Sequence, residues 1–404
     1  MSKLDDLINE LCPNGVEYKK ISEVCEISRG IVMSKDFIRD NAGNYPVYSS
    51  QTENDGCLGY INTYKYDGEY LTWTTDGANA GTVFYRNGKF SVTNVCGLLK
   101  VININLITKF LFYALNIEAP KHVNRGMGNA KLMSNVMDSI SIPVPPLAVQ
   151  CEIVRILDNF TELTAELTAE LTARKKQYEY YRDSLLTFKT EIPRVKLGDI
   201  ATEIYRGSGI KKDEVTLDGI PCVRYGEIYT KYNIWFDSCV SHTKLEYVYS
   251  PKYFEYGDIL FAITGESVED IAKSIAYVGK EKCLAGGDIV VMKHKQNPKY
   301  LSYALSTVDA IKQKGKGKVK SKVVHSSVPA IQDIEIPLPP LEIQERIVNV
   351  LDNFDAICSD LKIGLPAEID ARKKQYEYYR DLLLRFELLG TNIATHTHTH
   401  THTR

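Results

Sequence analysis

The chain has 404 residues, of which 44% are hydrophobic and 25% are charged, a composition typical of globular proteins with room for two or three domains. No apolar run approaches the roughly 20 residues that span a bilayer, and the first residues lack a signal-peptide pattern, so we expect a cytoplasmic protein without membrane contact. The formal net charge of −2 neither indicates nor excludes a polyanionic partner, because nucleic acids respond to local basic surface.

Neither metal sites nor catalytic sites are indicated by short motifs. The nine cysteines form no Cys-x-x-Cys pair, so neither a zinc site nor a disulfide framework is expected. There is no phosphate-binding Gly-x-x-x-x-Gly-Lys-Ser/Thr, no His-Glu-x-x-His, no Gly-x-Ser-x-Gly and no dinucleotide fingerprint. Alternating Thr and His in 390–404 could bind metal, but a disordered tail is the favoured interpretation.

The first module, residues 1–145, is expected to be a mixed α+β domain. Segments 70–74, 81–85 and 97–102 are rich in β-forming residues and are separated by Gly and Asn, and a helix is predicted over 107–115. Polar side chains in its turns are candidates for contacts with DNA base edges: Ser49, Ser50, Gln51, Thr75, Asp76 and Asn79. For any single one, a purely structural role is at least equally plausible.

A long helix is predicted over 146–190. Pro145 and Pro146 precede it, and proline is tolerated in a first helical turn but not deeper. Its apolar residues recur at steps of three, four or seven and predict one stripe on about 60 Å of helix. The stripe includes Leu157, Phe160, Leu163, Leu167, Leu171, Tyr178 and Tyr181.

The second module, residues 191–339, repeats the pattern of the first with different residues. Strands are predicted at 258–264, 274–278 and 288–292, and a helix at 299–311. The modules resemble each other where they begin, at Lys20–Gly30 and Lys196–Gly207, and both segments end in Arg-Gly. The candidate DNA contacts from these segments and from the second module are Arg29, Arg206, Arg224, Tyr225, Glu227, Thr264 and Glu266.

Basic loops that contain glycine precede the Pro-Pro pair of each module. In the first, the loop runs from Lys121 to Lys131 and includes Arg125; in the second, lysines occupy every second position from 312 to 322. A solvated lysine loop is the alternative to DNA contact, but the matching positions favour two clamps on the phosphate backbone. The candidates are Lys121, Arg125, Lys131, Lys314, Lys316, Lys318 and Lys320.

A second long helix is predicted over 340–389, with Leu351, Phe354, Tyr376 and Tyr379 in a stripe that matches the first. Two such stripes are most simply buried against each other in a coiled coil. Gly364 and Pro366 predict a break or kink in this helix. The opening residues of the chain resemble the junction after the central helix, so we expect a circular, pseudo-twofold layout with antiparallel helices and one module at each end.

The two helical regions share segments that are too similar to arise by chance. The eleven residues Ala-Arg-Lys-Lys-Gln-Tyr-Glu-Tyr-Tyr-Arg-Asp occur at 173–183 and again at 371–381. Ile-Pro-x-Pro-Pro-Leu-x-x-Gln ends at Gln150 and at Gln344, and Leu-Asp-Asn-Phe occurs at 157–160 and at 351–354. Between these, the central copy carries two tandem Thr-Ala-Glu-Leu units, 164–171, and is four residues shorter than the distal copy.

These motifs, with Val-Arg-Tyr-Gly-Glu-Ile at 223–228 and Ile-Thr-Gly-Glu at 263–266, resemble the DNA-specificity (S) subunits of type I restriction-modification systems over nearly the whole chain. The tandem Thr-Ala-Glu-Leu resembles the type IC branch. The resemblance implies two target-recognition domains that each read half of a bipartite, asymmetric site in double-stranded DNA. It also implies docking of two methyltransferase (M) subunits on the helices, and assembly with motor-nuclease (R) subunits.

The resemblance further implies a non-catalytic chain. S-adenosylmethionine would then be bound by the M subunits, and ATP with Mg by partner subunits, with no cofactor in this chain. One alternative is an adaptor whose coiled coil joins two protein-binding domains, and another is a fused methyltransferase, which would bind S-adenosylmethionine by itself. Neither half-site sequence can be inferred, because base reading depends on loop geometry.

Overall fold

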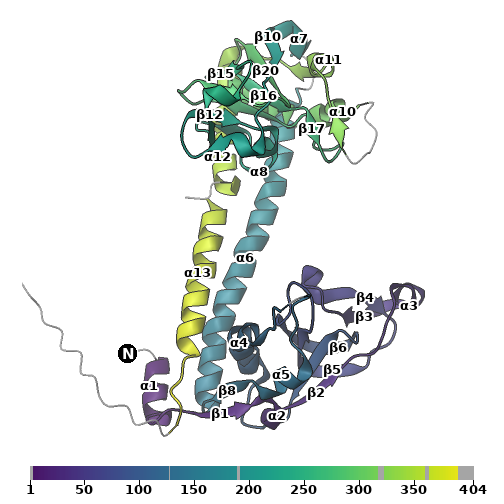
Figure 1. Ribbon diagram of the computed structural model, residues 1–404, viewed down its shortest axis with the longest axis vertical. Helices are drawn as coiled ribbons and strands as arrows, with labels where there is room; N and C mark the ends of the chain where they lie inside the picture. Colours follow the sequence, from purple (N-terminus) through teal and green to yellow (C-terminus); the bar gives the residue numbers. More distant parts are fainter. Residues whose placement is uncertain (1–2, 127, 189–191, 317–322, 360–363, 390–404) are drawn as a thin grey trace, which may run out of the picture. The chain divides into compact units, whose positions relative to one another are not determined.

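Figure 1 shows a computed structural model that describes residues 3–126, 128–188, 192–316, 323–359 and 364–389. The chain forms two compact units: unit 1 comprises Met1–Ala165 and Ala371–Arg404, and unit 2 comprises Glu166–Asp370. The division falls inside helix α6 (Leu147–Leu186). Each unit therefore combines one globular module with parts of the long helices, and the α+β class is confirmed.

Unit 1 is built on a six-stranded sheet in the order β2-β7-β5-β6-β3-β4. Neighbours are antiparallel except β3 and β6. Helix α4 (Thr108–Glu118) packs on β5 and β6 and buries Phe110 and Leu111 beside Trp73. The strands are β2 (Cys25–Arg29), β3 (Ala42–Tyr48), β4 (Cys57–Ile61), β5 (Tyr66–Thr74), β6 (Val83–Val92) and β7 (Cys96–Val101).

Short elements complete unit 1. Strand β1 pairs with β8 in antiparallel fashion, so the chain enters and leaves the module side by side. The 3-10 turns are η1 (Glu53–Gly56) and η2 (Ala119–His122). The remaining elements are α1 (Lys3–Leu11), β1 (Glu17–Lys20), α2 (Ile21–Val24), α3 (Lys35–Asp40), α5 (Ser134–Ser139) and β8 (Ser141–Val144).

Unit 2 contains the same core arrangement. Its strand order β10-β20-β16-β18 has the pairing of β2-β7-β5-β6, and helix α9 (Pro298–Leu305) takes the place of α4. The matching roles predicted for the strands of the two modules are confirmed. This sheet comprises β10 (Ala201–Arg206), β13 (Trp235–Phe236), β16 (Ile259–Ala262), β18 (Ser274–Tyr277) and β20 (Ile289–His294).

Beyond this core the modules differ. Unit 1 extends its sheet by β3 and β4, whereas unit 2 adds a second sheet in the order β11-β14-β12-β19-β15. That sheet comprises β11 (Val215–Thr216), β12 (Ile220–Val223), β14 (Ser241–Thr243), β15 (Tyr253–Phe254) and β19 (Cys283–Ala285). The other elements are β9 (Arg194–Lys196), α7 (Leu197–Ile200), η3 (Lys212–Glu214), α8 (Tyr225–Thr230), η4 (Leu245–Tyr247), β17 (Thr264–Gly265), α10 (Val308–Gly315), β21 (Val324–His325), α11 (Val328–Gln332) and β22 (Glu335–Pro337).

The distal helical region consists of α12 (Leu341–Ser359) and α13 (Leu365–Leu383). Pro366 lies in the first turn of α13, where its missing N–H has no cost, and residues 360–363 lie outside the described part. Gly364 itself is not helical, and α13 begins directly after it.

Each unit pairs its helices antiparallel. In unit 1, Val16 and Tyr18, next to and within β1, bond the carbonyls of Glu387 and Phe386. Because β1 pairs with β8, which leads into α6, the start of α6 lies near the end of α13. In unit 2, β9 follows α6 and pairs with β22, which leads into α12. The end of α6 therefore lies near the start of α12.

The Gln of each Ile-Pro-x-Pro-Pro-Leu-x-x-Gln motif is fully buried and joins the long helix to its module. The Gln150 side chain accepts a hydrogen bond from the Ile107 N–H at 2.8 Å and donates to the Pro145 carbonyl at 2.7 Å. The Gln344 side chain likewise accepts from the Asn297 N–H and donates to the Pro339 carbonyl. A buried amide that lost these partners would cost about 1–3 kcal/mol, which explains why both copies keep Gln.

The Asp of each Leu-Asp-Asn-Phe motif binds two side chains one helical turn apart. Asp158 accepts from Lys109 and from the Tyr113 hydroxyl, both at 2.6 Å. In unit 2, Asp352 accepts from Lys299 at 2.6 Å and from Tyr303 at 2.7 Å. Burial and the bonded carboxylate raise the pKa of both tyrosines, so they stay protonated donors.

The repeated segments also contact each other reciprocally. In unit 1, the Phe160 ring stacks on Tyr379 at 5.5 Å; in unit 2, Phe354 stacks on Tyr181 at 5.6 Å. Each contact joins Leu-Asp-Asn-Phe of one copy to the eleven-residue string of the other. Most of the predicted packing stripe is covered: Leu157, Leu351 and Tyr178 are buried, and Phe160, Leu163, Leu167, Leu171, Phe354 and Tyr376 are half-buried. Tyr181 and Tyr379 are exposed, at 40% and 36%, although their rings stack on the partner phenylalanines.

We expect a double-mutant cycle on Phe354 and Tyr181 to give a coupling of about 0.5–1.5 kcal/mol in urea unfolding, because stacked rings contribute this much beyond burial. Phe160 and Tyr379 should give a similar value. Phe354 with the fully exposed Tyr249 is the control pair and should show no coupling. Zero coupling in both stacked pairs would mean that ring stacking between the eleven-residue segments and the Leu-Asp-Asn-Phe segments does not stabilise the helix pairs.

Candidate nucleic-acid interface

In unit 1, loops that are far apart in sequence gather at one edge of the sheet. The hydroxyls of Ser50 and Thr75 both donate to the Val95 carbonyl. The Asn79 amide donates to Thr52 at 2.8 Å, and the Gly77 N–H donates to Ala130 in the basic loop at 3.0 Å. The structure therefore brings together most of the polar candidates chosen from the first module.

The individual candidates differ in what they offer to a ligand. Arg125 and Lys131 are exposed, whereas Lys121 pairs with Glu118 at 2.7 Å. Arg29, at the end of β2, donates to Ser134 at 3.2 Å.

The polar candidates in the turns bond within the module. Ser49 accepts from the Thr93 hydroxyl, and Gln51 donates to the Cys57 carbonyl. The choice of Thr75 as a base contact is wrong, because its side chain is buried and its hydroxyl donates a hydrogen bond to the Val95 carbonyl.

Unit 2 builds the corresponding edge. An isolated antiparallel bridge joins Asp76 to Lys131 in unit 1, and Thr264 bonds to His325 with the same sense in unit 2. Arg206 ends β10 as Arg29 ends β2, and it pairs with Asp288 at 2.5 Å. Lys131, in the basic loop of unit 1, and His325 of unit 2 therefore occupy equivalent positions, while residues 317–322 of the second basic loop lie outside the described part of the chain.

Two adjoining cavities follow this edge of unit 2. A cavity of about 240 Å³ is lined by Arg224, Asp288 and several glycines, and one of about 480 Å³ is lined by Tyr229, Thr264 and Glu266. Tyr225 and Gly226 line both, so the cavities adjoin at these residues, and we call the pair the Tyr225 groove. The choice of Glu227 as a base contact is wrong, because its carboxylate is buried and accepts from Ser241 and the Arg224 N–H.

The lysine loop is only partly a surface feature. Lys314 is buried and donates to the Ser274 hydroxyl at 3.0 Å and the Leu305 carbonyl at 2.8 Å, so its choice as a phosphate contact is wrong. Burial and the charge of Lys273 lower the pKa of the Lys314 amine to about 7. Lys316 is exposed, and Lys318 and Lys320 lie outside the described residues.

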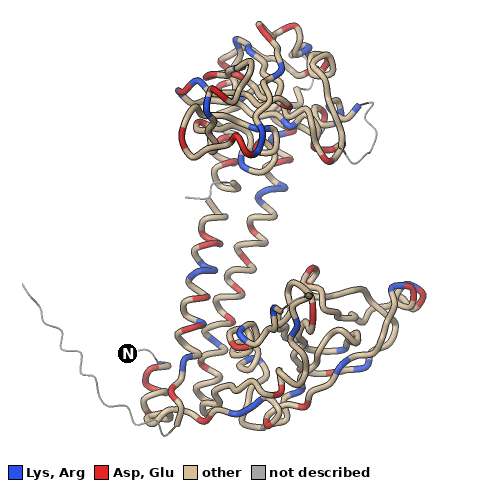
Figure 2. Tube along the Cα trace, viewed as in Figure 1, with Lys and Arg blue, Asp and Glu red and all other residues tan. Residues whose placement is uncertain are grey.

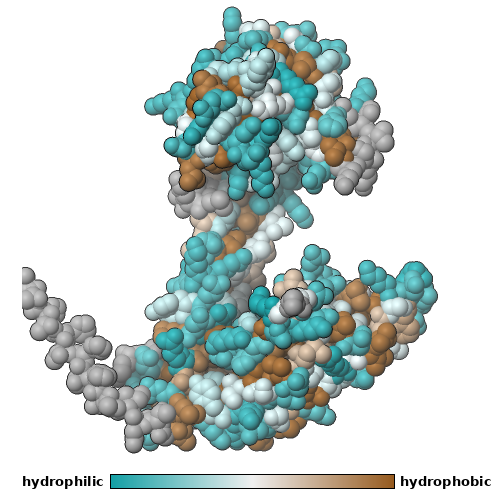
Figure 3. All heavy atoms as spheres, viewed as in Figure 1, coloured by the Kyte–Doolittle hydropathy of each residue, from teal (hydrophilic) through white to brown (hydrophobic). Residues whose placement is uncertain are grey.

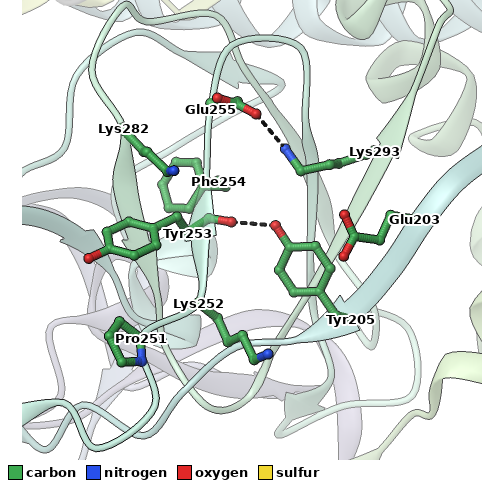
Figure 4. A pocket seen from close by; sticks show the side chains of 9 residues that line it. All are labelled: Glu203, Tyr205, Pro251, Lys252, Tyr253, Phe254, Glu255, Lys282 and Lys293. Atoms are coloured by element: carbon green, nitrogen blue, oxygen red, sulfur yellow. Dashed lines mark hydrogen bonds and ion pairs between the residues drawn. The ribbon is translucent and has the colours of Figure 1, made fainter.

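Another cavity in unit 2 contains none of the candidates. Figure 4 shows its lining, where the Tyr205 hydroxyl donates to the Tyr253 carbonyl and Lys293 pairs with Glu255. Its volume is about 210 Å³. Since Lys293 also binds the buried Asp258, its charge is already used within the fold, and we interpret this cavity as structural.

Neither charge nor hydropathy marks one dominant binding surface on either unit. Figure 2 shows Lys and Arg interspersed with Asp and Glu over both units, in agreement with the small net charge. Figure 3 shows hydrophilic residues over most of the visible face of each unit, with apolar residues in small patches.

Among the described residues, no group of three His, Cys, Asp or Glu could hold a metal ion, and all nine cysteines are free. No described helix is long and apolar enough to cross a membrane.

A family model for the type I restriction modification DNA specificity domain matches residues 13–174 and 191–371, one copy for each module with its helix. The chain belongs to this family. A putative type I specificity subunit of Mycoplasma pneumoniae is 35% identical over 91% of this chain and 97% of its own length. The specificity subunit of the type I restriction enzyme MpnII, from the same organism, is 47% identical over 43% of this chain and 53% of its own length.

Solved structures of specificity subunits have a similar fold. The S subunit from M. genitalium matches with a TM-score of 0.52 at 16% identity and covers 91% of this chain and 95% of its own. A chain from a study of complex assembly and conformational transition of the type I restriction-modification system matches with a TM-score of 0.61 at 14% identity, covering 92% and 98%. The two-module architecture with long helices is thus the fold of this family.

The sequence reasoning missed the two motif aspartates, although a signal was present. Lys-x-x-x-Tyr occurs at 109–113 and at 299–303, in the predicted helix of each module. Residues four apart share one helix face, so this pair could bind one carboxylate. A search for such pairs in both copies would have predicted how each long helix is attached to its module.

Replacing the buried Lys314 by Met should change how stability depends on pH. The folded-state pKa of about 7 is below the model value of 10.5, so between these values the unfolded chain binds more protons and wild-type stability rises with pH. The wild type should therefore gain stability relative to Lys314→Met between pH 7 and pH 9, by at most about 1.4 kcal/mol per pH unit. Urea unfolding measures this, with the exposed Lys316→Met as a pH-independent control. A wild-type advantage that does not grow with pH would contradict a depressed pKa.

Proposed function

We propose that this chain is the DNA-recognition subunit of a type I restriction-modification enzyme, in which each module reads one half of a bipartite, asymmetric site. The observation that carries the proposal is the duplicated sheet edge: both units contain the same four-stranded core, and the bridge of Asp76 with Lys131 in unit 1 corresponds to that of Thr264 with His325 in unit 2, so divergent polar loops lie at equivalent positions. A shared scaffold with different loops suits one binding mode with two sequence specificities.

The exposed part of the eleven-residue string supports docking of two identical partners. Tyr180 and Tyr378 are 70% and 65% exposed and occupy equivalent positions. Their rings make edge contacts with Tyr181 and Tyr379, and most of their surface remains exposed. Exposed tyrosine is enriched at protein interfaces, and equal surfaces suit two copies of one methyltransferase subunit. Restriction subunits would join that complex.

The chemistry is assigned to the partners. The chain carries no catalytic motif, and we assign S-adenosylmethionine and adenine methylation to the methyltransferase subunits, and ATP with Mg to the restriction subunits. The complex would act in the cytoplasm on double-stranded DNA. We also propose that the chain belongs to the type IC branch, because its tandem Thr-Ala-Glu-Leu units resemble that branch.

The proposal is tested by purifying the chain with its methyltransferase partner, methylating a DNA library and sequencing the modified adenines. A two-part motif with an unread spacer is expected. The competing proposal, an adaptor that joins protein-binding domains, predicts that the same complex has no affinity for DNA.

Inserting one further Thr-Ala-Glu-Leu unit after Leu171 should lengthen the unread spacer. Four residues add about 6 Å of helix, against about 3.4 Å of axial rise per base pair, so one or two base pairs are expected. Both half-site sequences should stay the same. A changed half-site with the original spacer would refute the proposal that the helix sets the spacing.

Replacing the exposed Arg125, Lys131 and Lys316 by Ala should weaken binding to all DNA sequences alike. Each lost phosphate contact should reduce the slope of log K against log[salt] by roughly 0.9, so by up to about 3 together. Titrations at several salt concentrations measure the slope. The buried Lys314→Met is the matched control and should leave the slope unchanged; an unchanged slope in the triple variant would exclude these loops from DNA contact.

A further inference from the structure

Arg224 is the most closely confined cation of the Tyr225 groove. It lies between β12 and α8, where the Gly286 N–H bonds to the Val223 carbonyl at 2.8 Å and the Arg224 N–H bonds to Glu227 at 2.9 Å. These bonds fix the backbone on both sides of the residue. The side chain therefore starts from a defined position on the wall of the groove.

The Arg224 side chain is held by its surroundings as well. A Cβ on Gly286 would lie 3.3 Å from the Arg224 Cα and 3.8 Å from its Cγ, so glycine leaves room for the stem. The Nε is buried and, within the described residues, has no hydrogen-bond partner, while the buried Glu227 carboxylate lies 3.9 Å from it. The side chain as a whole is 30% exposed and lines the 240 Å³ cavity. The exposed part of the Arg224 side chain therefore faces the groove, while its Nε lies beside the buried carboxylate of Glu227.

This arrangement differs from that of Arg206 on the same edge. Arg206 is 60% exposed and already binds Asp288 and the Gly287 carbonyl. Arg224 makes no side-chain hydrogen bond among the described residues, yet its charge faces Glu227. A compensated charge is attracted less to phosphates, but a guanidinium keeps its planar fork of donors. Such a group suits a ligand with two adjacent acceptors.

We infer that Arg224 reads a guanine in the half-site of the second module, with its guanidinium donating to O6 and N7 in the major groove. Guanine offers these two acceptors side by side, whereas adenine offers a donor in place of one of them. Glu227 is a positioning residue that orients the guanidinium without touching DNA. The inference rests on the proposed function, because it requires that this module contacts base edges.

The test is a methylation map of the complex with its methyltransferase partner on a DNA library with random positions. Arg224→Gln should reduce the preference for one G·C pair in one half-site by roughly 5- to 150-fold, the range for one bidentate pair. The other half-site and the spacer should not change. Lys231→Ala removes a charge at the end of α8 without altering the groove lining, and it should leave the whole motif intact.

Glu227→Gln separates positioning from folding. It keeps the shape of the site, and it should weaken the preference at the same base pair while making binding more salt-dependent, because the Arg224 charge is no longer compensated. If Arg224→Gln fails to fold, Arg224→Met, which keeps a long apolar stem but has no donor, should lose the same preference.

The outcomes distinguish the two proposals. Wild-type complex that methylates no two-part motif would refute the proposed function. A wild-type motif that Arg224→Gln or Arg224→Met leaves unchanged, with only uniformly weaker binding, would refute the guanine contact and make Arg224 a phosphate contact.

Discussion

The attachment of each long helix to its module depends on one buried amide and one carboxylate. Gln150 and Asp158 bind the helix α4 region in unit 1, and Gln344 and Asp352 bind the α9 region in unit 2. Hydrogen bonds to charged groups contribute about 1.5–3 kcal/mol, more than most single contacts of a surface helix. Together with the apolar contacts of Val149, Ile153 and Leu157 in unit 1 and of Ile347 and Leu351 in unit 2, they fix the register of each helix on its module.

With the attachment fixed, the sheet edge can vary. The shared core β2-β7-β5-β6 and its counterpart β10-β20-β16-β18 bury the largest apolar side chains, so stability resides there. The loops at the edge contribute few of these contacts and are free to differ in length and chemistry. This separation explains why the modules share almost no sequence beyond their first strands and still hold equivalent loops in equivalent places.

The sequence predicted the architecture well because it is repeated, but it predicted the site less well. Periodicity located α6 and the packing stripe, since a long amphipathic helix has a strong pattern. It could not show that Thr75, Glu227 and Lys314 are buried, because polar residues in loops look the same whether they support a backbone or face solvent. The contact of Arg224 with Glu227 is different, because the two residues lie three apart at the start of α8, a spacing that the sequence itself contains.

The antiparallel pairing of β1 with β8, and of β9 with β22, has a consequence for how such proteins change their targets. Each module begins and ends on two neighbouring strands, so it is connected to the rest of the chain like an insertion with adjacent ends. A whole module could be exchanged for an unrelated one at these strands while the helices keep their length and their partner surfaces. New DNA specificity can then be acquired in one recombination event, without a series of intermediates that bind neither site.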